Sequence, residues 1–371
     1  MTATTLEGLE HLLDQRWLSD MVGFPAAASK IRIKPETSIL ASLTNTSNGQ
    51  IEHWVRLLWP QSHNKAQITE QWAAKRGHVV ATTTIPGDLV FQFGSIYADP
   101  KLNKYLEPEF LGFQLPGWSN ILRYNPSRRI VAKNNGKIIR VTVKPSSHGK
   151  VIDDFLESVI PTPRRFDDGS NPHTSIVQRV GDADLSQISS LTATETAGRI
   201  LGELHKSTNK VPDTLRPILH ERTINFHQSM EAHANIFTCL DSEISQRIRR
   251  LAREIPELPR HDVVLSHGDA SPDQYLISLH DGHVWLTDFD RICFDDPSRD
   301  LGSYLSVIEP SEKDAFLEGY ATVLGSLPPS ETLAISQIQA QMLRVAEPLR
   351  SGDLHWRRKT VNVLSSLEEV M

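Results

Sequence analysis

Apolar and polar residues alternate along several segments in the first half of the chain. The alternation over residues 120–133 and 137–145 predicts half-buried antiparallel strands. Apolar residues then recur at helical spacing over residues 150–159, which predicts a helix with one buried face. The second half is mainly helical by the same test, over residues 211–260, most clearly at 242–255, and again over residues 310–323 and 330–371. The pattern therefore predicts an α+β fold with its long strands near the N-terminus.

One short frame occurs twice among the predicted strands. The letters R-x-x-P-x-x-x-I-[LV]-A describe residues 32–41 and again residues 123–132, and each copy leads into a second strand. Two copies are too few for a repeat array, so they predict a duplicated β-hairpin unit. The second strand of the first copy is crowded with apolar residues, so we expect it to pack on the sheet formed by the second copy.

The stretch 263–305 carries the chemistry that can be recognised in the sequence. Apolar runs at 275–277 and 284–286 flank Asp281-Gly282, which predicts a β-hairpin. Asp269 precedes this hairpin and Asp288 follows it. One loop can thus hold a general base, and the next can hold an anionic metal ligand. Phosphoryl transfer needs such a carboxylate and hard oxygen ligands for Mg²⁺.

Together these residues resemble a known family. The pattern is His267-Gly268-Asp269, Gln274, Asp288-Phe289-Asp290, Asp296-Pro297 and Asp300-Leu301-Gly302. It is similar to the signature of aminoglycoside phosphotransferases and choline-kinase-like small-molecule kinases, which are relatives of the protein kinases. Gln274 stands where that family usually has Asn. A Gln at this position is similar to the maltokinase and glucosamine-kinase branch. That branch often reads Asp-Phe-Glu-Gly where this chain has Asp288-Phe289-Asp290-Arg291.

The resemblance implies a protein-kinase-like bilobal α+β fold preceded by a cap that contains the first hairpin copy. We expect the cap over residues 1–110, the N-lobe over 111–181, and the C-lobe with the catalytic loop and substrate-binding helices over 182–371.

The resemblance also assigns roles in the site. It implies that Asp269 is the catalytic base and that His267 positions the loop. It implies that Gln274 and Asp288 bind Mg²⁺, while Asp290 is either a further ligand or a solvated acid. Asp300 would brace the catalytic loop, and His205 reads most simply as a structural histidine.

Nucleotide contacts are expected on the N-lobe. Arg140 takes the position of the family's phosphate-binding Lys, and Lys144 follows it on the same strand. The acidic partner of Arg140 stays open among Asp153, Asp154 and Glu157. The strand Ser175–Gly181, followed by Asp182–Leu185, resembles the hinge between the lobes, with Gln178 and Val180 beside the ATP base; the alternative is an ordinary edge strand and turn.

Composition narrows the partners. The net charge of −6 argues against a nucleic-acid or anionic-membrane binder. The N-terminal segment lacks the features of a signal peptide, and no segment is long and apolar enough to cross a membrane, so we expect a cytoplasmic protein. Two distant cysteines, Cys239 and Cys293, are expected to be reduced thiols. The sequence leaves the oligomeric state open.

The resulting prediction is an ATP- and Mg²⁺-dependent kinase acting on a hydroxyl of a small molecule such as an aminoglycoside, an amino sugar or another sugar. Two alternatives remain. Arg140 and the absence of a glycine-rich loop also fit a catalytically weak nucleotide sensor. The D-x-D motif at Asp288 also occurs in phosphohydrolases with an Asp nucleophile, but there it opens the first α/β unit, whereas here it lies late in a hairpin.

Overall fold

The first part of the fold is a five-stranded antiparallel sheet flanked by short helices. A computed structural model describes residues 3–115, 117, 120–222, 225–259 and 262–371, so residues 1–2 of the expected cap lie outside it. The strands follow the order β1-β2-β3-β5-β4. The elements of this part are α1 (Thr5–Leu13), α2 (Gln15–Val22), β1 (Ala26–Lys34), β2 (Ser38–Asn45), β3 (Ile51–Leu58), α3 (Asn64–Ala74), β4 (Val80–Ile85), β5 (Leu89–Ser95) and α4 (Pro108–Leu111). We call residues 3–110 the cap.

A second sheet follows the cap, with four antiparallel strands in sequence order. Its elements are β6 (Ile121–Asn125), β7 (Arg129–Asn134), β8 (Lys137–Thr142), α5 (Gly149–Glu157) and β9 (Thr174–Gln178). The helix α5 lies within one residue of its expected start and two of its expected end. The remaining strands are short: β10 (Ala183–Asp184), β11 (Val264–Ser266), β12 (Tyr275–Ile277), β13 (Val284–Leu286) and β14 (Cys293–Asp295).

Helices make up most of the rest of the chain, which confirms the predicted α+β class. They are α6 (Leu191–Lys206), α7 (Arg216–His220), α8 (Phe226–Thr238), α9 (Ser242–Glu254), α10 (Pro297–Leu305), α11 (Pro310–Leu324), α12 (Ser330–Leu343), α13 (Glu347–Arg350) and α14 (Trp356–Val370). Among the described residues no helix is long and apolar enough to cross a membrane. Cys239 and Cys293 are both free thiols.

The duplicated frame forms two hairpins with the same irregularities. β1 pairs with β2 and β6 pairs with β7, and in each pair the register shifts just before the shared arginine, Arg32 or Arg123. The residue after the shared proline has a positive φ in both copies, 50° at Glu36 and 56° at Ser127. The two units also touch, because Arg32 Nη1 donates to the carbonyl oxygen of Pro126 at 3.3 Å. The predicted duplication is therefore present in the backbone as well as in the letters.

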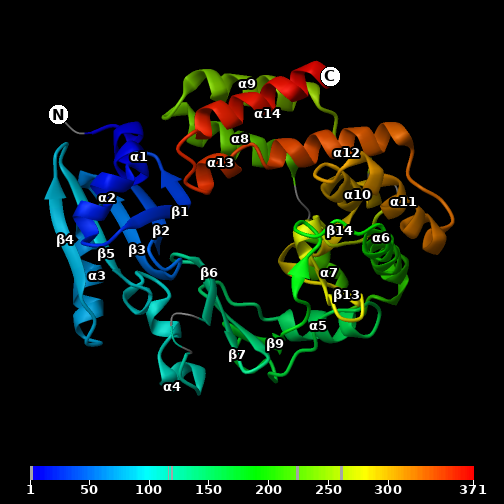
Figure 1. Ribbon diagram of the computed structural model, residues 1–371, viewed down its shortest axis with the longest axis horizontal. Helices are drawn as coiled ribbons and strands as arrows, with labels where there is room; N and C mark the ends of the chain where they lie inside the picture. The colour runs from blue at the N-terminus through cyan, green and yellow to red at the C-terminus, as the bar shows by residue number, and fades with distance from the viewer. Residues whose placement is uncertain (1–2, 116, 118–119, 223–224, 260–261) are drawn as a thin grey trace.

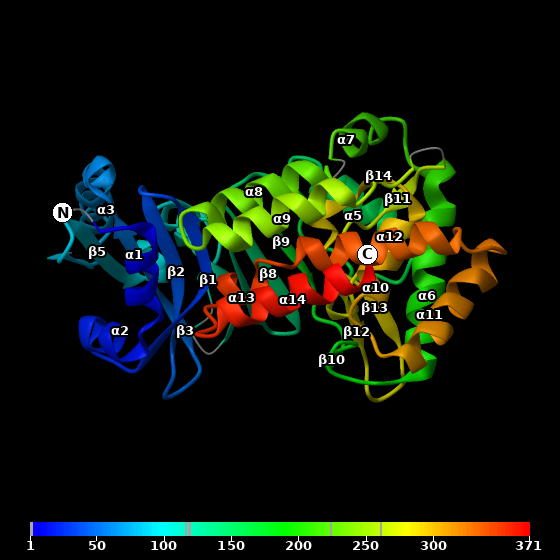
Figure 2. The same cartoon turned by 90° about the horizontal axis from the view of Figure 1, so that it is seen from above.

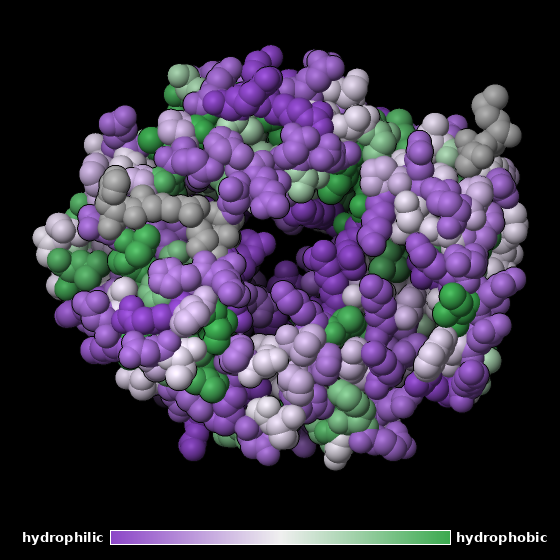
Figure 3. Space-filling model, turned by 180° about the vertical axis from the view of Figure 1, so that it is seen from behind, coloured by the Kyte–Doolittle hydropathy of each residue, from purple (hydrophilic) through white to green (hydrophobic). Residues whose placement is uncertain are grey.

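The chain closes into a ring around a central opening. Figure 1 shows the cap next to the β6–β9 sheet, that sheet next to the lobe built on α6, α10 and α11, and α8, α9 and α14 returning to the cap. Figure 2 shows the same three helices extending from the cap toward the C-terminal lobe. In the space-filling view of Figure 3 the opening is visible and its rim is mainly hydrophilic.

Two apolar cores hold the cap in this ring. Trp54 packs in one core with residues of the second sheet, such as Tyr124 and Ile139. Leu57, on the opposite face of β3, and Trp59, just after the strand, pack in a larger core with residues of α8, α9 and α14. The expectation that β3 packs on the second sheet is therefore right for Trp54 but wrong for Leu57 and Trp59. Alternate residues of a strand point to opposite faces, so β3 joins two partners.

We expect Leu57→Ala to lower the free energy of unfolding by about 2–5 kcal/mol, the usual cost of a cavity at a fully buried leucine. Leu57 is 0% exposed in the core that joins the cap to the C-terminal helices. Urea denaturation measures the change. The matched control is Leu279→Ala, because Leu279 is 61% exposed. Equal stabilities of the two variants would show that the cap contributes little to the folded state.

Candidate functional site

The loop after β11 carries Asp269. Its backbone turns at Gly268, where φ is +79°. A Cβ at this position would lie 2.4 Å from the carbonyl oxygen of Arg291, so only glycine fits. Asp269 itself is partly exposed, and its carboxylate lies 3.1 Å from Arg291 Nη1. The turn therefore presents a carboxylate at a fixed place while its backbone stays packed.

Asp300, in α10, fixes the backbone of this loop through hydrogen bonds. Its buried carboxylate accepts hydrogen bonds from the backbone N–H groups of His267 at 2.6 Å and Gly268 at 2.8 Å. It also accepts one from Ser266 Oγ at 2.9 Å and lies 3.1 Å from His205 Nε2. The expected bracing role of Asp300 agrees with these contacts.

The environment of Asp300 favours its ionised form. Burial by itself would raise the pKa of Asp300, but the hydrogen bond and charge of His205, the charge of His267 and the hydrogen bond from Ser266 together lower it below its usual value. His205 is oriented on its other side by the hydroxyl of Tyr320, 2.9 Å from Nδ1. His205 is thus a hydrogen-bonded structural histidine, as expected.

His267 links the Asp269 loop to the loop that contains Asp288. Its ring is fully buried, and Nε2 lies 2.8 Å from the carbonyl oxygen of Thr287. The ring also packs edge to face on Phe289. These contacts fit a positioning residue, because the side chain makes no exposed surface from which it could reach a substrate.

Asp288 and Asp290 follow β13 and face two arginines. Asp288 has a positive φ of 62°, which is unusual for a residue other than glycine and occurs often at functional sites. Its carboxylate lies 3.3 Å from Arg140 Nη1 and 3.6 Å from Arg129 Nη2. Asp290 lies 2.6 Å from Arg129 Nη1 and also contacts Arg140. Two carboxylates and two guanidinium groups thus form one cluster.

The arginines also keep Asp288 ionised. Burial disfavours its charged form, but the positive charges of Arg140 and then Arg129 outweigh burial and lower its pKa. Asp153, Asp154 and Glu157, the acidic candidates for pairing with Arg140, bind Arg165, Lys150 and Arg164 respectively. In this structure the partners of Arg140 are therefore Asp288 and Asp290.

Gln274 lies beside this cluster on the neighbouring loop. Its side-chain nitrogen donates to the carboxylate of Asp273 at 2.8 Å, and its backbone carbonyl accepts a hydrogen bond from the backbone N–H of Thr287 at 3.0 Å. The hydrogen bond to Asp273 leaves the side-chain oxygen as the atom that can bind a cation. The β12–β13 hairpin that separates Gln274 from Asp288 forms as predicted, and it places both residues at one cavity.

The donor set fits Mg²⁺. The described residues contain no cluster of three or more His, Cys, Asp or Glu side chains that could hold a metal by itself. Mg²⁺ usually takes only one or two carboxylates from the protein and completes its shell with phosphate and water. Asp288, Asp290 and the oxygen of Gln274 meet that requirement.

The residues expected to contact the nucleotide do not all lie at one cavity. Gln178 and Val180 line a second cavity of about 400 Å³, together with Gly136 and Trp285. Lys144 is exposed beyond the end of β8 and does not line either cavity described here. The structure therefore brings Arg140 to the carboxylates and leaves Lys144 outside.

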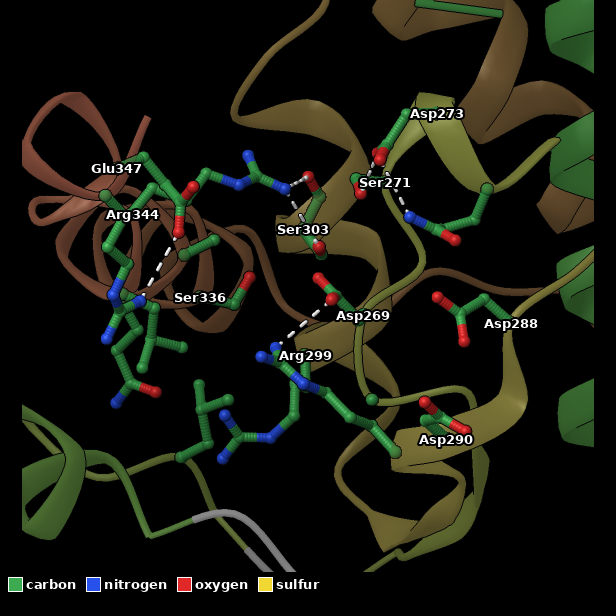
Figure 4. A pocket seen from close by; sticks show the side chains of 18 of the residues that line it. Asp269, Ser271, Asp273, Asp288, Asp290, Arg299, Ser303, Ser336, Arg344 and Glu347 are labelled. Carbon is green, nitrogen blue, oxygen red and sulfur yellow. Dashed lines mark hydrogen bonds and ion pairs between the residues drawn. The ribbon is translucent and has the colours of Figure 1, made fainter. Parts of the chain in front are cut away.

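The cavity lined by Asp269, Gln274 and Asp288, which we call the main cavity because it holds the expected site residues, has a volume of about 330 Å³ and includes residues that the sequence did not indicate. Arg123 reaches it from β6, and Gln339, Arg344, Glu347 and Arg350 reach it from α12, α13 and the segment between them. Glu347 and Arg350 line the cavity, whereas Leu349 between them is buried. Figure 4 shows Asp269 between the side with Asp288 and Asp290 and the side with Arg344 and Glu347.

Comparisons with known proteins identify relatives of this arrangement. Residues 152–333 match the family described as "Phosphotransferase enzyme family". A choline kinase structure from Cryptosporidium parvum Iowa II is 13% identical, with a TM-score of 0.51, and the match covers 69% of this chain and 91% of that one. This likeness shows a shared fold.

Two further solved structures are similar over comparable lengths. A choline/ethanolamine kinase family protein from Mesorhizobium loti is 13% identical, with a TM-score of 0.48, covering 73% of this chain and 93% of the other. An aminoglycoside-3'-phosphotransferase of type VIII is 16% identical, with a TM-score of 0.42, covering 60% and 90%. No curated protein sequence matches the chain.

We expect Asp300→Asn to lower the free energy of unfolding by about 3–5 kcal/mol at pH 7, because it removes a buried charge from donors arranged to receive it. Urea denaturation measures this loss. The ionised form of Asp300 is favoured by folding, so its contribution is present above the unfolded pKa of about 3.9 and is lost as pH falls below it. The gap between wild type and variant should therefore narrow below about pH 4.

The control for this substitution is Asp281→Asn in the exposed turn after β12, where Asn can still accept the hydrogen bond from His283. We expect a change within about 0.5 kcal/mol. If Asp300→Asn were equally harmless, Asp300 would not be the support of the loop.

Proposed function

We propose that this chain, whose residues 152–333 match the phosphotransferase enzyme family, transfers the γ-phosphoryl group of ATP to a hydroxyl of a small molecule. The observation that carries the proposal is the meeting of Asp269, Gln274 and Asp288 at one cavity. Aminoglycosides, amino sugars and other sugars are the first acceptors to test.

Asp269 is the proposed base. Its carboxylate is partly exposed at the cavity and its loop is fixed by Asp300, so it can orient an acceptor hydroxyl and receive its proton. Arg291, 3.1 Å away, is positioned to hold the carboxylate in place before the acceptor arrives. The position of the proposed base is therefore fixed by Asp300 and Arg291.

The cluster around Asp288 is proposed to hold the phosphates and the metal. Mg²⁺, when bound, would neutralise the charge that develops on the transferred phosphoryl group. Asp288, Asp290 and Gln274 would hold the ion, and Arg140 and Arg129 would turn from the carboxylates to the phosphates. This exchange keeps every charge paired, because the ion replaces the guanidinium groups on the carboxylates.

Arginine at position 140 suits this exchange. Its planar guanidinium can bind two oxygens of one phosphate at once, which a lysine cannot do in the same way. The contact of Arg140 with both Asp288 and Asp290 already shows that its reach extends across the cluster. The absence of a lysine is therefore compatible with catalysis, and we favour the enzyme over a nucleotide sensor.

We expect Asp269→Asn to lower the rate of phosphoryl transfer by roughly two to four orders of magnitude, the range for loss of a positioned base. The affinity for Mg·ATP should change little, because Asp269 is not among the proposed metal ligands. Product formation by mass spectrometry and ATP binding by calorimetry provide the two readouts. Asp213→Asn, at a fully exposed position, is the matched control. A variant with wild-type turnover would remove Asp269 from its proposed role.

We also expect Asp288→Ala to weaken Mg·ATP binding more than Gln274→Ala does. A carboxylate compensates the charge of the ion, whereas a neutral amide supplies only a dipole. Titration of Mg·ATP into both variants by calorimetry decides the order, and titration of ATP with chelator shows how much of each loss depends on the metal. Equal losses would mean that the two ligands are wrongly assigned.

A further inference from the structure

The side of the main cavity that lies beyond Asp269, away from Asp288 and Asp290, indicates the chemistry of the acceptor. This inference rests on the proposed function, because it concerns the molecule whose hydroxyl meets Asp269. The wall there comes from α10, α12 and α13, and Figure 4 shows Arg344 and Glu347 on it. We call this part of the cavity the acceptor side.

Arg344 is the central feature of the acceptor side. Its guanidinium donates to Ser306 Oγ at 2.9 Å, to the carbonyl oxygen of Ser303 at 3.2 Å and to Ser303 Oγ at 3.3 Å. All of these acceptors are neutral, and within the described part of the chain Arg344 forms no ion pair. Burial lowers the pKa of Arg344, although Asp269, Asp273 and Glu347 act against this at longer range. A partly buried cation fixed by neutral groups has an unused capacity to bind an anion.

The carboxylates that line the cavity do not serve as the anion that pairs with Arg344, because each has another partner. Asp269 pairs with Arg291, and Glu347 pairs with Arg350 at 3.3 Å. Asp273 accepts hydrogen bonds from Ser271 and Gln274. Asp288 and Asp290 belong to the cluster on the opposite side of Asp269.

Additional cations surround the acceptor side from other parts of the ring. Arg123 lines the cavity from β6, and Arg350 lines it from α13. Lys30 lies within β1 of the cap, at the register shift between Ser29 and Arg32, with a positive φ of 52°. Partial burial and then the charge of Arg123 lower the pKa of Lys30, while the charge of Glu347 acts in the opposite direction. The second sheet and the C-terminal helices therefore both bring positive charge to one cavity, and Lys30 adds its charge from the cap at longer range.

Gln339 adds a second observation that points to a ligand. It lines the cavity, is 1% exposed, and its side-chain nitrogen donates to the carbonyl oxygen of Pro256 at 2.6 Å. Its buried side-chain oxygen has no hydrogen-bond partner in the described residues. Buried polar atoms are nearly always paired, so this oxygen calls for an O–H or N–H donor.

We propose that the acceptor is a hydroxylated organic anion whose carboxylate or phosphate group binds Arg344 and one of whose hydroxyl groups donates to Gln339. Lys30 and Arg123 strengthen the attraction at longer range. Among the acceptor classes proposed above, this favours anionic sugars, because a polycationic aminoglycoside would meet repulsion from the same groups. The acceptor side thus selects by charge.

The transfer step balances with ATP as the only co-reactant. The acceptor oxygen forms a new bond to the γ-phosphorus, and the bond between that phosphorus and the bridging oxygen of ATP breaks with its electron pair leaving on ADP. The proton of the acceptor hydroxyl passes to Asp269. The anionic group on Arg344 takes no part in bond making, so it fixes the orientation of the hydroxyl.

The test uses the full chain with Mg²⁺ and a non-hydrolysable ATP analogue, and two series of compounds that differ in charge. The first is glucose, glucosamine, glucuronate and glucose 6-phosphate, and the second is glycerol, glycerate and glycerol 3-phosphate. In at least one series we expect the anion to bind about tenfold or more tightly than the neutral parent, as measured by calorimetry. Comparison of the carboxylate with the phosphate tells which anionic group is bound.

Arg344→Met should remove about tenfold of the affinity for the anion and leave the affinities for the neutral parent and for the ATP analogue unchanged. Lys30→Met, a substitution at an exposed residue of the cap, should cause a smaller loss of the same kind without affecting folding. Arg253→Met is the matched control, because its only described hydrogen bond is to the backbone of Arg249 on the same exposed helix face. Mass spectrometry with ATP in place of the analogue shows whether the bound anion is phosphorylated.

Several results would overturn the inference. They are tighter binding of glucosamine than of the anions, no binding of an anion in either series, and unchanged anion affinity in both Arg344→Met and Lys30→Met. In each case the proposed kinase function stands if Mg·ATP still binds and phosphoryl transfer to another compound is found. If Mg·ATP does not bind at all, the proposed function itself fails.

Discussion

The buried carboxylate of Asp300 is the interaction on which the site depends. It joins three parts of the chain: the loop after β11, the end of α6 through His205, and its own helix α10. Removal of a charge from water is costly, and this cost is offset here because the carboxylate receives hydrogen bonds from several donors at once. The position of Asp269 relative to Asp288 is therefore set by a group that itself never reaches the cavity.

Ion pairs between side chains of the protein balance the charges around Asp288. Arg129 and Arg140 come from the second sheet, whereas Asp288 and Asp290 come from the C-terminal lobe, so the ion pairs also hold these two parts together. The same groups are the ones proposed to bind ATP and Mg²⁺. Folding and ligand binding thus use one set of charges, with a change of partners between the two states.

The features that could be predicted from the sequence are those encoded locally. Asp269, Gln274 and Asp288 lie on one short stretch whose hairpin is marked by Asp281-Gly282. The repeated frame that begins at Arg32 and at Arg123 predicts the other two hairpins. The partners of Arg140 could not be found in this way, since they depend on how the second sheet faces the C-terminal lobe. Gln339 and Arg344 were missed for a similar reason, because an isolated helical segment does not reveal which face will line a cavity.

The ring gives the molecule the mechanics of a closed linkage. A two-lobed enzyme joined at one hinge can open like jaws, but here the lobes meet a second time where the cap packs on the C-terminal helices. That contact is tight: a Cβ at Gly352 would lie 2.1 Å from the carbonyl oxygen of Ala28 in β1. A rotation of the second sheet relative to the C-terminal lobe would therefore have to be matched by a rotation at the cap, as in a four-bar frame where no joint turns alone.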